Sequence, residues 1–136
     1  MYEVIEHTAD IGLRVSAATL EELFAEAGRG LLALVVENPE AVEPRQSLDL
    51  ALAAAAVEYL LFDWLAELLR VFDSRHLLLG AFQVQIDGLA LRARASGETA
   101  DPARHRLLRE IKAITYHRLS VARVNGGWRA EFIVDI

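Results

Sequence analysis

The sequence predicts an α+β fold, with two amphipathic helices packed on one side of a largely antiparallel or mixed β-sheet. Three observations predict this class: two apolar stripes at helical spacing, several segments that alternate apolar and polar residues, and two tight-turn motifs between such segments. The predicted elements do not alternate regularly between strand and helix, so a doubly wound nucleotide-binding fold is not expected. We expect residues 1–136 to form one domain, because a chain of this length can bury one core. The 54% of hydrophobic residues exclude an intrinsically disordered protein.

The first helix is predicted over residues 20–35, where apolar side chains recur on one stripe. Thr19 and Glu22 have the spacing of a capping box. In this motif the Thr19 hydroxyl accepts a hydrogen bond from the backbone N–H of Glu22, and the Glu22 side chain reaches back to the N-cap. Gly28 and Gly30 would each cost this helix about 1 kcal/mol relative to alanine. We therefore expect the two glycines to allow close packing against a sheet.

The second helix is predicted over about residues 54–72, a stretch rich in alanine and leucine without glycine or proline. Strands are predicted where apolar and polar residues alternate. They cover residues 11–17, 47–52, 82–87, 89–95, 119–124 and 128–136. Asp87-Gly88 and Asn125-Gly126-Gly127 favour tight turns that join neighbouring strands as hairpins. The segment 105–116 fits either a short helix or an irregular strand.

Composition excludes several classes of function. The 14 Lys and Arg against 20 Asp and Glu give a net charge of −6, which argues against gripping a nucleic-acid backbone by bulk charge. The absence of cysteine excludes a disulfide scaffold, a thiolate zinc site and a cysteine nucleophile. The sequence contains no Walker A loop, no dinucleotide-binding fingerprint and no nucleophile elbow. It also lacks a signal-peptide pattern and an apolar run long enough to span a bilayer, so we expect a cytoplasmic protein without membrane association.

Two clusters of polar residues are candidates for a functional site. The first is His7-Thr8-Ala9-Asp10-Ile11-Gly12, directly before a predicted strand, and its structural alternative is an ordinary turn capped by Thr and Asp side chains. The second is the end of the last strand, where the pleat turns Asp135 away from the face of Val134 and Ile136. Two carboxylates at one strand end, the Asp135 side chain and the chain terminus at Ile136, would attract a cation. The alternative is a frayed terminus with a hydrated acid.

Two further groups of polar residues combine side chains that can bind ligands or donate protons. Lys112, Thr115, Tyr116 and His117 could bind an anion or donate protons, or they could form a hydrated sheet edge with one aromatic anchor. Glu98, Asp101 and His105 fall in a predicted polar loop over residues 96–104 and its flank, where acids and a histidine are usually only hydrated.

At these clusters the sequence resembles the archease family. The resemblance extends over essentially the whole chain and depends on an ordered set of motifs. These are His7-Thr8-Ala9-Asp10-Ile11-Gly12, Thr19-Leu20-Glu21-Glu22-Leu23-Phe24, Asp63-Trp64-Leu65-Ala66-Glu67-Leu68-Leu69, Gly97-Glu98, Ile111-Lys112-Ala113-Ile114-Thr115-Tyr116-His117 and Val134-Asp135-Ile136.

The resemblance implies a small α+β protein that is not itself an enzyme. Such a protein assists the tRNA-splicing RNA ligase by promoting its covalent GMP-histidine intermediate and its repeated turnover. The resemblance also implies a divalent cation held by Asp10 and Asp135, with Ile136 contributing through its main-chain carbonyl or its carboxylate. Oxygen ligands without thiolates favour calcium, magnesium or manganese over zinc or copper, and the resemblance implies calcium among these. His7, Lys112, Thr115 and His117 are implied as neighbours of this site or as contacts to the partner.

Two other functions remain open at the level of the sequence. One is a metal-dependent phosphoesterase in which Asp10 and Asp135 hold the ion and His7 or His117 acts as base. The other is a general protein chaperone or interaction module with a purely structural acid cluster. Direct RNA binding is disfavoured by the net charge, so RNA is expected to be contacted only indirectly, through the ligase. A local arginine patch on the ligase-facing or RNA-facing side would come from Arg92, Arg94, Arg104, Arg106 and Arg109. The oligomeric state is left open.

Overall fold

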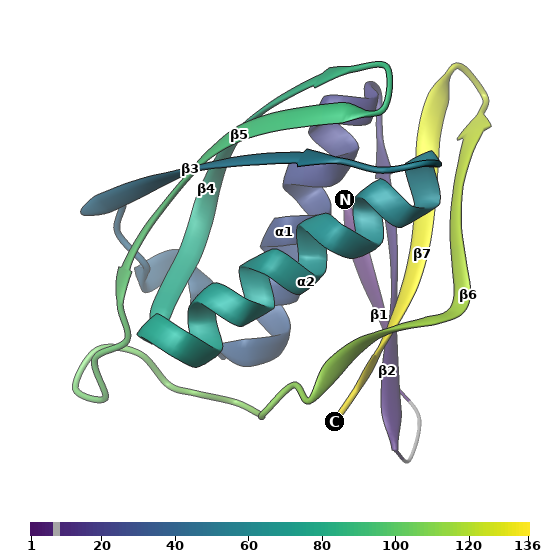
Figure 1. Ribbon diagram of the computed structural model, residues 1–136. Helices are drawn as coiled ribbons and strands as arrows, with labels where there is room; N and C mark the ends of the chain where they lie inside the picture. The colour runs from purple at the N-terminus through teal and green to yellow at the C-terminus, as the bar shows by residue number, and fades with distance from the viewer. Residues whose placement is uncertain (7–8) are drawn as a thin grey trace.

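The computed structural model describes residues 1–6 and 9–136, and its strands form two antiparallel sheets (Figure 1). The first sheet has the strand order β1-β2-β7-β6. Its strands are β1 (Tyr2–Glu6), β2 (Asp10–Ala17), β7 (Gly127–Asp135) and β6 (Ala113–Val124). Strands from both ends of the sequence are therefore neighbours in one sheet.

The second sheet has the order β3-β5-β4 and is also antiparallel throughout. Its strands are β3 (Gln46–Ala53), β5 (Ala90–Thr99) and β4 (Leu77–Asp87). The predicted hairpin turns are confirmed by their backbone conformation. Gly88 has φ 62°, and Asn125 and Gly126 have φ 48° and 78°, which are left-handed conformations that Gly and Asn adopt readily.

The two helices lie between the sheets and contact strands of both (Figure 1). Helix α1 (Leu20–Val35) packs mainly on β4 and β2, while α2 (Val57–Arg75) packs on β6 and on the second sheet. A short 3₁₀ turn, η1 (Pro39–Ala41), follows α1. The core includes three fully buried aromatic side chains, Phe24, Trp64 and Phe132, and the Trp64 indole N–H donates to the Phe24 carbonyl at 2.9 Å.

The glycines of α1 occupy the points where the helix approaches its neighbours most closely, as predicted. A Cβ atom on Gly28 would lie 2.9 Å from the ring of Phe82 in β4. A Cβ atom on Gly30 would lie 2.7 Å from Leu13 Cδ2 in β2. The two glycines therefore allow α1 to be sandwiched between the two sheets.

The predicted α+β class, with two helices packed on antiparallel sheets, is confirmed. The strands divide into two sheets that enclose the helices, whereas the sequence had suggested one sheet with helices on a single side. The structure adds β1 to the predicted strands, and it shows residues 105–112 as an irregular segment, with β6 beginning at Ala113. The backbone N–H of Glu22 donates to Thr19 Oγ1 at 3.1 Å, as expected, but the Glu22 side chain pairs with Arg29 instead of reaching back. In the described part of the chain, neither helix is long and apolar enough to cross a membrane.

Candidate functional site

Asp10 and Asp135 face each other across the antiparallel pair of β2 and β7. Asp10 is the first residue of β2, Asp135 is the last residue of β7, and the sheet register pairs them directly. The main chain is tied together around them: the Ile136 N–H donates to the Ala9 carbonyl at 3.3 Å, and the Lys112 N–H donates to the Asp135 carbonyl at 2.8 Å. Antiparallel pairing thus brings together two carboxylates from opposite ends of the sequence.

Both carboxylates project from the face of the sheet that points away from the helices. Their neighbours Ile11 and Val134 are fully buried in the core, so the alternating pleat turns Asp10 and Asp135 to the outer face. Asp135 is exposed and Asp10 is half-buried. Like charges directly opposite each other on a sheet are destabilising. Among the described residues, none forms a hydrogen bond or ion pair with either carboxylate.

A second pair on the same face shows the usual arrangement. Arg14 of β2 lies opposite Glu131 of β7, and Arg14 Nη2 is 3.3 Å from Glu131 Oε1. Opposite charges on neighbouring strands stabilise the sheet, whereas the pair Asp10–Asp135 leaves two negative charges together. The described residues contain no group of three or more His, Cys, Asp or Glu side chains suited to a metal. The described residues therefore place two acidic side chains together at this edge.

Strand β6 carries a wide bulge beside this edge. Thr115 pairs with Ile133 and Ser120 pairs with Glu131, so Phe132 alone stands opposite residues 116–119. The Thr115 hydroxyl donates to the Ile133 carbonyl at 3.1 Å and accepts from the His117 N–H at 3.2 Å. Arg118, within the bulge, has φ 54°. Bulges re-aim side chains next to binding sites, and this one turns His117 to the surface.

The structure brings most of the predicted site residues to one end of the first sheet. Lys112 and Ile136 directly adjoin the Asp10–Asp135 pair through the main-chain bonds described above. Thr115 lies two residues from Ala113, which pairs with Asp135, and its hydroxyl is engaged in holding the bulge. His117 is exposed in the bulge itself. The predicted neighbour His7 lies outside the described residues.

A second polar cluster was missed at the level of the sequence, where Glu98 and His105 were interpreted as hydrated loop residues. That interpretation is wrong: their exposed fractions are 4% and 2%. Glu98 lies in β5 and accepts hydrogen bonds from Arg104 Nη1 at 2.5 Å, Arg104 Nη2 at 3.0 Å and the Glu43 N–H at 2.6 Å. His105 Nε2 lies 3.2 Å from Glu98 Oε2. The cluster therefore fastens the segment after β5 to the loop between η1 and β3.

The hydrogen-bond donors around Glu98 favour its charged carboxylate. The Arg104 guanidinium, and next the Glu43 backbone N–H, lower the pKa of Glu98 from 4.5 to about 2, although burial alone would raise it. Nothing in the pattern of residues 96–104 distinguishes this loop from a hydrated one. The alternation of β5 would even place Glu98 on the face opposite Gly97, whereas both residues are buried.

A family model described as the Archease protein family matches residues 2–136, which is nearly the entire chain. The chain belongs to the archease family. Curated relatives agree: the archease of Thermococcus kodakarensis is 38% identical over 140 residues, which cover 99% of this chain and 98% of the relative. The archease of Methanopyrus kandleri is 38% identical over 139 residues, which cover 99% of each chain.

Solved structures of related proteins have the same fold. The solution structure of protein 1598 from Methanobacterium thermoautotrophicum superposes with a TM-score of 0.87 at 29% identity and covers 99% of this chain and 98% of its own. The crystal structure of the Thermotoga maritima archease, a protein described as a possible chaperone, superposes with a TM-score of 0.67 at 23% identity. It covers 100% of this chain and 98% of its own, and at that identity it supports the fold alone. The family suggested by the ordered motifs is thereby confirmed.

Proposed function

We propose that this archease is an accessory activator of the tRNA-splicing RNA ligase, without catalytic activity of its own. In this role it promotes the ligase's guanylylation and supports repeated turnover, and it contacts RNA only through the ligase. Membership of the archease family supports the proposal. The observation that carries it is the cross-strand pair of Asp10 and Asp135, two carboxylates without a compensating charge among the described residues. We expect the protein to act in the cytoplasm, and the absence of a spanning helix in the described residues is compatible with this location.

The donor set at this edge fits a hard divalent cation. Carboxylates supply oxygen ligands and the sequence contains no cysteine, so calcium, magnesium or manganese are favoured over zinc or copper. Among these we propose calcium, as the resemblance to the family implies. Asp10 and Asp135 would hold the ion, and Ile136 would contribute an oxygen from its carbonyl or carboxylate. Calcium takes six to eight oxygen ligands, so water and groups of the ligase would complete the set. When bound, the cation supplies charge neutralisation at the pair.

The residues around the pair suit contact with a partner. Lys112, next to the pair, and His117, in the bulge further along β6, are both exposed, and each can donate a hydrogen bond or face an acidic group of the ligase. Thr115 holds the bulge that presents His117, so we assign Thr115 a positioning role. These residues lie at one end of the first sheet, which we propose as the end that faces the ligase.

A guanylylation assay tests the proposal. The cognate ligase is incubated with labelled GTP, and the covalent GMP–ligase adduct is followed with and without this protein. We expect the wild-type protein to raise the rate by a factor on the order of ten, the usual size of coupling between two sites. Asp10→Asn and Asp135→Asn should remove most of this stimulation, because each takes away one of the two charges.

A matched control uses an aspartate elsewhere in the fold. Asp49 is exposed on β3, in the other sheet, and forms an exposed ion pair with Arg94 at 3.1 Å. Asp49→Asn should keep full stimulation, since exposed ion pairs contribute little to stability. Equal stimulation by all three variants would contradict the role of the Asp10–Asp135 pair. Cleavage of a phosphodiester by the protein alone would instead favour a metal-dependent phosphoesterase, and protection of unrelated unfolded proteins would favour a general chaperone.

A further inference from the structure

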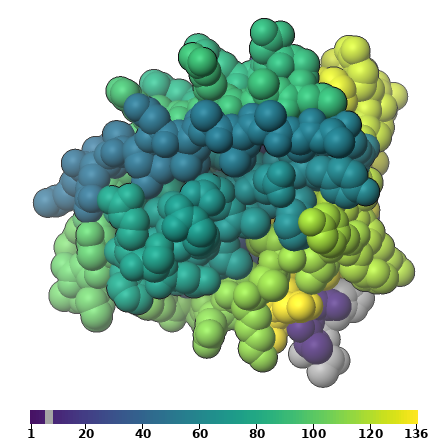
Figure 2. Space-filling model, viewed as in Figure 1, coloured from purple at the N-terminus to yellow at the C-terminus, as the bar shows by residue number. Residues whose placement is uncertain are grey.

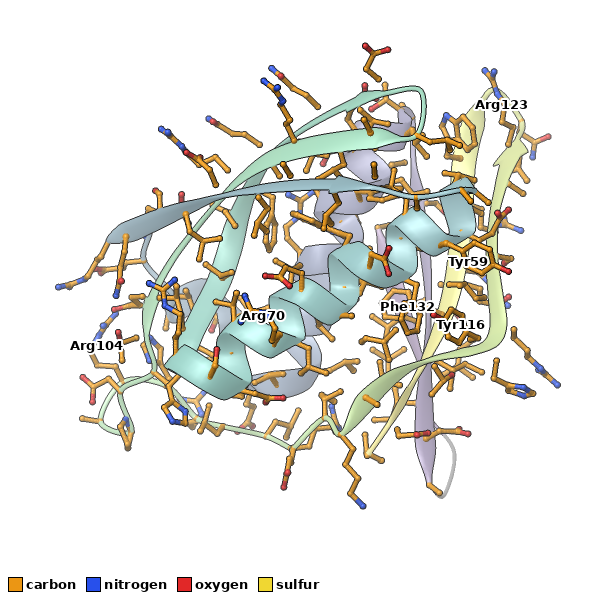
Figure 3. The ribbon with its side chains drawn as sticks, viewed as in Figure 1. Tyr59, Arg70, Arg104, Tyr116, Arg123 and Phe132 are labelled. Atoms are coloured by element: carbon orange, nitrogen blue, oxygen red, sulfur yellow. The ribbon has the colours of Figure 1, made fainter. Side chains whose placement is uncertain are left out.

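Three aromatic side chains form an open cluster where α2 meets the bulge of β6. The rings of Phe62 and Tyr116 are stacked, with centroids 4.0 Å apart and planes 8° apart, and Tyr59 meets Tyr116 edge to face at 6.0 Å. Tyr59 and Tyr116 are 52% and 61% exposed, far more than core aromatic residues. Figure 3 shows the two tyrosines pointing toward one another from α2 and β6, and Figure 2 shows these two elements side by side on the viewed face. Exposed aromatic clusters of this kind usually mark binding surfaces.

The cluster opens into a pocket that also contains a carboxylate. The pocket has a volume of about 810 Å³ and is lined by Ala56, Glu58, Tyr59, Tyr116 and Leu119. Glu58 forms no ion pair with any described residue. By contrast, Glu67 on the same helix is paired with Arg70. The pocket therefore combines aromatic rings with a negative charge that the described part of the chain does not neutralise.

We propose that this pocket binds an arginine side chain of a protein partner. A guanidinium ion is planar, stacks on tyrosine rings and pairs with a carboxylate, so it satisfies the rings and Glu58 together. Lysine offers a compact point charge and matches the flat rings less well. A nucleic-acid strand could also stack its bases on tyrosine, but its phosphates would be repelled by Glu58 and by Asp63, which likewise has no ion partner among the described residues.

The bulge connects this pocket to the Asp10–Asp135 edge. Thr115 holds the bulge on the outer face of the sheet, and the next residue, Tyr116, reaches the pocket beside α2. Because β6 is the edge strand of the first sheet, a partner would reach both places around that edge. Its identification with the RNA ligase depends on the proposed function, whereas the preference of the pocket for arginine does not.

Nuclear magnetic resonance tests the pocket directly. The protein is titrated with N-acetyl-Gly-Arg-Gly-amide, with its citrulline analogue and with a short oligouridylate, while the ring signals of Tyr59 and Tyr116 are followed. Citrulline keeps the shape of arginine but loses the charge. We expect saturable shifts with the arginine peptide and affinity weaker by about fivefold for citrulline, as a partly exposed cation–π contact with a charge pair implies. Equal affinity for both peptides, or preferred binding of the oligouridylate, would overturn the proposal.

Variants separate the pocket from the proposed function. Glu58→Gln and Tyr116→Ala should each weaken arginine-peptide binding, while Glu67→Gln, on the same helix but outside the pocket, should leave it unchanged. Ring shifts that depend on protein concentration without peptide would show that a second copy of the chain occupies the pocket, and would overturn the proposal. If the peptide binds as expected but the ligase is neither bound nor stimulated, the proposed function fails and the pocket assignment stands. If the ligase is stimulated equally by wild-type and Glu58→Gln protein and the peptide does not bind, only the pocket assignment fails.

Discussion

His105 and Glu98 form a buried hydrogen bond whose direction is set by a third group. His105 Nδ1 accepts from the Asp101 N–H at 2.9 Å, so the ring proton resides on Nε2, which lies 3.2 Å from Glu98 Oε2 and donates to it. Glu98 thus receives hydrogen bonds from a histidine, an arginine and a backbone amide. All of these favour the charged carboxylate, which makes this cluster sensitive to acid.

The first prediction concerns the acid stability of the fold. The pKa of Glu98 is about 2 in the folded protein and 4.5 in an unperturbed chain. In this range the unfolded state binds more protons, so the contribution of Glu98 is complete above about pH 4.5 and is lost as the pH falls toward 2. We expect Glu98→Gln to be less stable at neutral pH and to show a flatter decline between these values. Urea unfolding midpoints measured from pH 7 to pH 2 check this.

Glu110→Gln is the matched control. Glu110 is exposed, and its substitution removes the same formal charge as Glu98→Gln does. It should follow the wild-type dependence on pH. If Glu98→Gln loses stability on acidification as steeply as the wild type does, the carboxylate at position 98 is not the group responsible.

The second prediction concerns Gly97, at the shifted register of β4 and β5. A Cβ atom on Gly97 would lie 1.6 Å from the Leu78 carbonyl oxygen, a backbone atom that cannot move aside cheaply. We expect Gly97→Ala to destabilise the fold by about 3 kcal/mol or more, the upper range for overpacking. Gly12→Ala is the control, since its new Cβ would meet its nearest neighbour at an ordinary 3.6 Å. Equal unfolding free energies for the two variants in urea would contradict this account.

Local signals predicted most of the elements, because they depend on near neighbours in the sequence. The helix starting after Thr19 and the hairpin turn at Asn125-Gly126 needed only capping and turn chemistry. The division into two sheets depends on which strands pair across long separations, such as β2 with β7. Alternation within one strand carries no information about its partner, so a single sheet and two sheets predicted the same pattern.

The candidate site divides in the same way. The pleat alone predicted that Asp135 would point away from the core, and the resemblance to archeases joined it to Asp10, but only the register of β2 and β7 places the two side by side. The bulge that exposes Tyr116 breaks the two-residue period and was therefore invisible in the alternation. The burial of Glu98 depends on Arg104 and Glu43, which a pattern of polar residues does not reveal.

The third prediction concerns the strained backbone of the bulge. Arg118 has φ 54°, a conformation that costs a residue with a side chain about 1–2 kcal/mol. Arg118→Gly should therefore stabilise the fold by about 0.5–1 kcal/mol, since part of the gain is offset by greater freedom of the unfolded chain. Arg92→Gly, at an exposed position within β5, should instead destabilise by about 0.5–1 kcal/mol. Chemical unfolding that gives both changes the same sign would argue against strain at Arg118.

The fourth prediction concerns the response of the Asp10–Asp135 pair to calcium. In chelator, Asp135→Asn should stabilise the protein by about 0.2–1 kcal/mol, because it removes a like-charge pair on neighbouring strands. With calcium added, the wild type should gain about 2.7 kcal/mol when the free ion reaches one hundred times its dissociation constant. Asp135→Asn should lose most of that gain, since one of the two acidic ligands is missing. Thermal unfolding with and without calcium measures both effects.

Asp135→Asn should raise stability in chelator and lower the stability gained from calcium. These opposite effects distinguish a metal site from simple charge repulsion. Repulsion alone predicts that Asp135→Asn is more stable than the wild type with or without calcium. A cation held by both carboxylates predicts that the order of stability reverses when calcium is added. Asp49→Asn, whose carboxylate faces Arg94 instead of another acid, should show neither the gain in chelator nor the reversal. If the order does not reverse for Asp135→Asn with calcium, magnesium or manganese, the pair does not hold the proposed ion.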